Sequence, residues 1–156
     1  MKIRARFFIL LLCLCGIGLS IASLHSHYAA SATDYCDLSQ VFNCDLVNRS
    51  KFSKVFGIPV ALIGLVGYAF LLGVTAKRNR ALTVLRFYAS LAGLAFASCL
   101  AYIEAHVLET WCLLCIGSLV AITGITVFSA VEIWCSEKRN GISGSGKTKV
   151  EYSPSK

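Results

Sequence analysis

Trp111-Cys112-Leu113-Leu114-Cys115 stands at the start of a long apolar run, because no charged residue occurs from Thr110 to Val131. A run of that length can cross a bilayer as a helix. The two thiols therefore lie at the mouth of a membrane span, where they can close a small disulfide ring and where the helix N-terminus lowers the pKa of the exposed thiol. A reactive dithiol beside lipid favours electron exchange with a lipid-soluble molecule. The alternative is that two small, fairly apolar residues simply pack, as a lone buried cysteine usually does.

The composition predicts an integral membrane protein, since 56% of the 156 residues are hydrophobic and only 15% are charged. Each of four uncharged stretches can form one span, for which roughly 17 to 25 residues are needed. The third is the shortest, but Arg86 at its end can snorkel and so lengthen it. We expect an all-α membrane protein: a four-helix bundle with a long outer loop between helices 1 and 2. Residues 1–135 form the bundle, with spans at about 7–24, 55–76, 82–103 and 110–134, and residues 136–156 form a disordered cytoplasmic tail.

The basic residues predict the orientation of these spans. By the positive-inside rule both termini lie in the cytoplasm, and the first and third loops lie outside. The net charge of +7 follows from this topology and gives no indication of nucleic-acid binding, because the basic residues flank apolar spans. They are Lys2, Arg4 and Arg6 before the first span, Lys77, Arg78, Arg80 and Arg86 between the second and third, and Lys138, Arg139, Lys147, Lys149 and Lys156 after the fourth.

The first apolar stretch has a second interpretation. Its basic start, apolar core and Ala30-Ser31-Ala32 sequence also fit a cleaved signal peptide. We favour a retained span, because the apolar run is longer than a usual signal core and the candidate cleavage site lies well beyond its end. Either interpretation places the following loop outside.

The outer loop carries a second pair of thiols, Cys36 and Cys44, which readily pair in an oxidising compartment. With Cys112 and Cys115 they make four thiols on one side of the membrane. A zinc site formed by these four is the alternative, but the spacing of the first pair is too wide for the usual zinc hairpin. We therefore favour redox chemistry and expect no metal.

These residues resemble the vitamin K epoxide reductase family. The resemblance rests on Cys36-Asp37, Cys44, Ser50, Phe56-Gly57 opening the second span, and Cys112-Leu113-Leu114-Cys115 opening the fourth. It covers roughly residues 25–119 and implies a four-helix bundle around a quinone. Phe56-Gly57-Ile58-Pro59 is more similar to bacterial members, which implies a bacterial inner membrane with the active site on the periplasmic side.

The resemblance also implies a path for electrons. A reduced thioredoxin-fold protein attacks the Cys36–Cys44 disulfide, Cys44 passes the electrons to Cys112, and Cys115 faces a quinone of the ubiquinone or menaquinone type. Ser50 can hydrogen-bond a thiolate or a quinone oxygen; alternatively it caps a helix. The partner is expected to be a separate chain, because the residues after the fourth span are too few for a thioredoxin-like domain.

Two positions depart from animal members of the family. Leu119 replaces a tyrosine and Ser53 replaces an asparagine, both associated with binding the oxygens of vitamin K. The departures favour quinone reduction coupled to protein disulfide formation over epoxide reduction. A non-enzymatic redox sensor or metal-binding membrane protein is the alternative from another class.

The phosphate-loop pattern at residues 141–148 has no strand before it, and we interpret it as a chance match.

Overall fold

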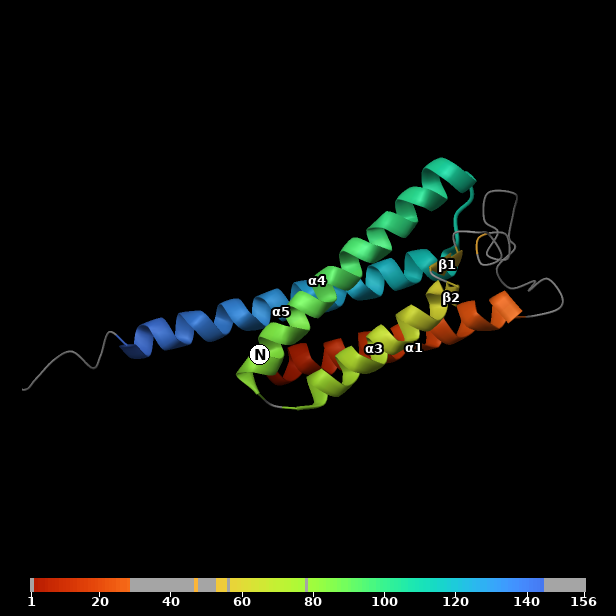
Figure 1. The fold of residues 1–156 in the computed structure, drawn as a ribbon. Coiled ribbons are helices and arrows are strands. Elements are labelled where there is room, and N and C mark those ends of the chain that lie inside the picture. The colour runs from red at the N-terminus through yellow and green to blue at the C-terminus, as the bar shows by residue number, and fades with distance from the viewer. Residues whose placement is uncertain (1, 29–46, 48–52, 56, 78, 145–156) are drawn as a thin grey trace, which may run out of the picture.

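The computed structural model describes residues 2–28, 47, 53–55, 57–77 and 79–144. The main elements are four helices: α1 (Lys2–Tyr28), α3 (Val60–Ala76), α4 (Arg80–Ile103) and α5 (Leu113–Gly144). A π-helical turn, η2 (Glu104–Leu108), extends α4. Figure 1 shows α1 beside α3, while α4 crosses α5 and diverges from it towards the end that carries η2. The all-α membrane fold predicted from the sequence is therefore confirmed.

Within the described part of the chain, three helical segments are long and apolar enough to cross a membrane: Arg4–Tyr28, Arg80–Leu108 and Leu113–Lys138. Helix α3, with 17 residues, is at the lower limit of the required length. Large apolar side chains on the outer faces of the bundle are exposed, as expected where they meet lipid acyl chains and not water. Examples are Phe7, Leu14, Val66, Phe70, Val120 and Val127.

The start of α3 and the end of α5 differ from the sequence-based boundaries. The stretch expected to be helical from residue 55 begins instead as a tight hairpin of β1 (Lys54–Val55) and β2 (Ile58–Pro59), and α3 starts only at Val60. Gly57 has a φ of 81°, a conformation that glycine adopts at low cost and that a helix does not contain. At the other end of the chain α5 continues to Gly144, beyond residue 135, because Glu137, Lys138 and Arg139 are good helix formers.

Helix α1 packs against both α3 and α5, while α4 packs chiefly against α5. The core at this junction contains Ile9, Cys13, Tyr68, Leu71, Ala121, Ile122 and Ile125. Gly16 of α1 is required here, since a Cβ atom at that position would collide with the Tyr68 ring. The small residue lets α1 approach α3 closely enough to bury the aromatic side chain.

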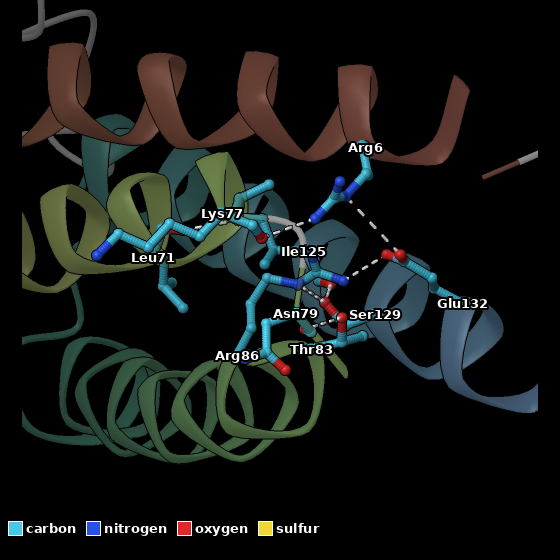
Figure 2. Close-up of polar contacts among 10 residues, drawn as sticks. Arg6, Leu71, Lys77, Asn79, Thr83, Arg86, Ile125, Ser129 and Glu132 are labelled. Carbon is cyan, nitrogen blue, oxygen red and sulfur yellow. Dashed lines mark hydrogen bonds and ion pairs between the residues drawn. The ribbon is translucent and has the colours of Figure 1, made fainter. Parts of the chain in front are cut away.

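The prediction that Arg86 snorkels to the membrane interface was wrong. Its side chain is only 1% exposed and turns into the bundle, where the guanidinium donates to Ser129 Oγ at 3.0 Å and to Glu132 Oε2 at 2.6 Å (Figure 2). Arg6 of α1 lies 3.9 Å from the same carboxylate and also donates to the Lys77 carbonyl oxygen at 2.8 Å. A buried acid is a better partner for Arg86 than the distant interface, because the ion pair offsets the cost of burying the charge.

Replacing Glu132 with alanine leaves the Arg86 charge buried without its counter-ion. We expect the variant to lose about 3 to 5 kcal/mol of stability, the usual effect of removing one partner of a buried ion pair. Thermal unfolding of the detergent-solubilised protein measures the loss. Glu137→Ala, an exposed position on the same helix, is the control and should change stability by less than about 0.5 kcal/mol. Equal melting temperatures in the two variants would contradict this role.

Candidate active site

Cys112 is the residue immediately before α5. Its carbonyl oxygen accepts the N–H of Ile116 at 3.0 Å, which is the first hydrogen bond of the helix. The chain reaches this position through Glu109, whose φ of 49° lies in the left-handed region, so the path turns sharply after η2. The turn leaves Cys112 completely buried at the outer end of the bundle.

Cys112 and Cys115 are both free thiols that contact each other across the first turn of α5. A hydrogen bond from the Cys115 thiol lowers the pKa of Cys112, with further help from the backbone N–H groups of Cys115 and Leu114. The sequence predicted a lowered pKa for an exposed thiol. The lowered pKa instead belongs to the fully buried one, because the first-turn donors converge on Cys112 and outweigh the effect of its burial.

Glu104, the first residue of η2, contacts the same thiol pair. Its side chain is 3% exposed, and its Oε2 accepts the backbone N–H of Cys112 at 3.1 Å. The Cys115 thiol also hydrogen-bonds the Glu104 carboxylate. Sequence analysis did not single out Glu104, although a carboxylate at the apolar end of the third span was a usable signal.

Cys115 lies in the wall of a cavity of about 400 Å³ enclosed by α1, α3, α4 and α5. That volume is within the range of small-molecule sites, and the lining is mostly apolar, as such sites are. A few polar side chains interrupt the apolar wall. They are Ser20, Ser23, His27, Ser53, Tyr68, Glu104 and Ser118.

Tyr68 and Ser118 form a polar bridge across this cavity, from α3 to α5. The Tyr68 hydroxyl lies 2.8 Å from the Ser118 carbonyl oxygen and 2.9 Å from its Oγ. Ser118 follows Cys115 by three residues and so shares its helix face. Sequence analysis did not single out either residue, although the spacing from Cys115 to Ser118 was a usable signal.

The predicted site residues are only partly described. Cys36, Cys44 and Ser50 lie outside the described residues. Val47 of the same outer loop is buried and packs against Cys112, together with Leu108 and Leu114. The outer loop therefore contacts the helix thiols through Val47.

The two positions that depart from animal relatives differ in their placement. Ser53 lines the cavity. Leu119 is absent from the cavity lining, and the adjacent Ser118 faces it.

Four packed helices that enclose an apolar cavity, with a dithiol at the start of one helix, define a membrane-embedded thiol redox protein. A sequence model of the vitamin K epoxide reductase family matches residues 7–130. The chain belongs to the vitamin K epoxide reductase family, and the resemblance seen in the sequence is confirmed. It is therefore an integral membrane oxidoreductase.

Two curated relatives align with this chain over most of their length. Vitamin K epoxide reductase complex subunit 1 from Rattus norvegicus is 28% identical over 141 residues, which cover 80% of this chain and 88% of the relative. The protein of the same name from Mus musculus is 28% identical over 142 residues, with the same coverage.

The dependence of Cys112 on Cys115 can be measured directly. In Cys115→Ala the principal hydrogen-bond donor is lost, so the pKa of Cys112 should rise and its thiolate absorbance should titrate at higher pH than in the wild type. Cys115→Ser retains a hydroxyl donor and should show a smaller rise. An unchanged titration in Cys115→Ala would assign the lowered pKa to the backbone N–H groups alone.

Proposed function

We propose that this protein is a quinone-reducing thiol–disulfide oxidoreductase that drives protein disulfide formation. A separate thioredoxin-fold protein gives electrons to Cys36 and Cys44, which pass them to Cys112 and Cys115 and then to a quinone of the ubiquinone or menaquinone type. The proposed location is a bacterial inner membrane, with the thiols on the periplasmic side. The supporting observation is that Cys115 lines the 400 Å³ apolar cavity while its partner Cys112 packs under the outer loop.

The placement of Val47 supports the transfer from the loop to α5. Val47 packs against Cys112 and follows Cys44 by three residues, a length of chain that spans at most about 11 Å. Such a short connection suits attack by the Cys44 thiolate on a Cys112–Cys115 disulfide. In that exchange a Cys44–Cys112 disulfide forms as the Cys112–Cys115 bond breaks, and Cys115 leaves as a thiolate.

The apolar cavity supports a lipid-soluble acceptor. Transfer of both electrons from the dithiol to a quinone forms the Cys112–Cys115 disulfide and a hydroquinone. A quinone is a suitable sink, because strongly oxidising thiol carriers are held oxidised by quinones and not by a thiol buffer. Reduction of vitamin K epoxide is the alternative substrate chemistry, and Leu119 offers no hydroxyl group for it.

Trapping experiments test this electron path. Cys115→Ser should accumulate a Cys44–Cys112 disulfide, because the thiol that would resolve it is missing. Cys36→Ser should instead hold a mixed disulfide between Cys44 and the thioredoxin-fold protein, while a small dithiol still supports quinone reduction. Mass spectrometry of non-reduced peptides identifies both species.

The control is Cys99→Ser, which removes an exposed thiol of α4 and should behave as the wild type. Quinone reduction by a small dithiol should be lost in Cys115→Ser. Undiminished activity in that variant would show that the helix pair is not the quinone-reducing centre. Bound zinc in a protein without turnover would favour the metal-binding alternative.

Two glycines of α3 test whether the substrate occupies the cavity. An added Cβ atom meets no atom within 4 Å at Gly67 or at Gly73, but only Gly67 lines the cavity. Gly67→Leu should raise the Michaelis constant for a short-chain quinone by roughly tenfold or more, equivalent to about 1.4 kcal/mol of lost binding. Gly73→Leu should leave it unchanged. Equal constants in the two variants would place the quinone elsewhere.

A further inference from the structure

Glu104 is a buried carboxylate at the end of α4, where η2 begins. Its side chain is 3% exposed at the end of α4, and the described residues provide no cationic partner for it. At the other end of α4, the buried pair of Arg86 and Glu132 satisfies each charge with the other. Because an unpaired ionisable side chain at membrane depth is costly, it marks a functional site more often than a structural one.

The surroundings of Glu104 place it in contact with the reacting thiols. Its Oε2 accepts the Cys112 backbone N–H at 3.1 Å, and the Cys115 thiol interacts with the same carboxylate. Glu104 and Cys115 both line the cavity. A π-helical turn, which often occurs at functional sites, begins at Glu104.

We infer that Glu104 is a catalytic base, which accepts the proton of Cys115 and transfers it to a quinone oxygen. The inference rests on the proposed quinone reduction and deepens it by assigning the path of one proton. The reactive dithiol holds Cys112 as a thiolate and Cys115 as a thiol. When the S–S bond forms, two electrons pass to the quinone, the Cys115 proton passes through Glu104 to one quinone oxygen, and the second oxygen takes a proton from the outer aqueous phase.

Other titratable groups around the cavity are less suited to this role. His27 approaches from α1 and Tyr68 from α3, and both line the cavity. The Tyr68 hydroxyl is already engaged with the carbonyl and hydroxyl groups of Ser118. Only Glu104 contacts both Cys112 and Cys115 among the acidic and basic side chains that the structure describes there.

Glu104→Gln is the decisive variant, because the amide keeps a hydrogen-bond acceptor for the Cys112 N–H but cannot carry the proton. Full-length protein in lipid nanodiscs is assayed with a short-chain ubiquinone analogue and dithiothreitol. We expect kcat/KM to fall about 100-fold or more, in the range for loss of a general base. The melting temperature should stay close to that of the wild type. Glu109→Gln, an exposed position five residues away, is the matched control and should keep full activity.

The pH profile separates a proton carrier from a helix cap. As a base, Glu104 acts only when ionised, so wild-type kcat/KM should fall at acidic pH as the carboxyl group becomes protonated. Protonation of the Cys112 thiolate also slows the reaction in acid, so the number of ionisations on the acidic limb is the readout. The wild type and Glu104→Asp should show two, with a lower maximum for Glu104→Asp, and Glu104→Gln should show one. An unchanged acidic limb in Glu104→Gln, or a rate close to that of the wild type, would overturn the inference.

Two further outcomes are distinguishable. If Glu104→Gln fails to fold, the profiles of the wild type and Glu104→Asp decide, and a single ionisation on the acidic limb of both would overturn the inference. A wild-type protein that binds the quinone analogue but never reduces it would overturn the proposed function itself. If the wild type and the Glu104→Gln variant were equally active, the proposed function would stand, and only the proton transfer through Glu104 would be rejected.

Discussion

The hydrocarbon core of a bilayer contains no water that could hydrogen-bond to peptide N–H and carbonyl groups. A helical chain that crosses this core must therefore pair these groups within its own helices. Polar chemistry is then confined to helix ends and to cavities between helices. Cys112 lies just before α5 and uses the unpaired N–H groups of the first turn, while Cys115 lies within that turn and lines the cavity. The position of the dithiol is thus a consequence of the same constraint that makes the protein helical.

The two ends of the bundle each contain a buried carboxylate, but the two carboxylates have different partners. At one end Glu132 joins Arg86 and, at longer range, Arg6, so that α1, α4 and α5 are held together by a paired carboxylate (Figure 2). At the other end, the partners of Glu104 among the described residues are a backbone N–H and a thiol. Removing one partner of a buried ion pair is costly, whereas a carboxylate that lacks such a partner keeps its oxygens available to exchange a proton. The difference in partners therefore separates a structural acid from a chemically active one.

Apolar runs and basic flanks were sufficient to predict the helical membrane fold, since span length and charge placement follow from the bilayer alone. The sequence also identified Cys112 and Cys115 through their spacing and position. It could not identify Arg86–Glu132, Glu104 or Tyr68–Ser118, because each depends on how helices far apart in the chain meet. The hairpin before α3 was missed for a local reason, the positive φ of Gly57.

In the proposed function, the offset between the two thiols lets the outer loop and a lipid-soluble acceptor use one disulfide. Three residues of helix separate Cys112 from Cys115, a rise of about 4.5 Å along the axis. Cys112 is covered by Val47 of the outer loop, while Cys115 shares a helix face with Ser118 and meets the cavity. In the proposed electron path each thiol reacts with a different partner, and neither partner needs to enter the other's compartment. In this path, a single turn of helix connects the loop side of the dithiol with its cavity side.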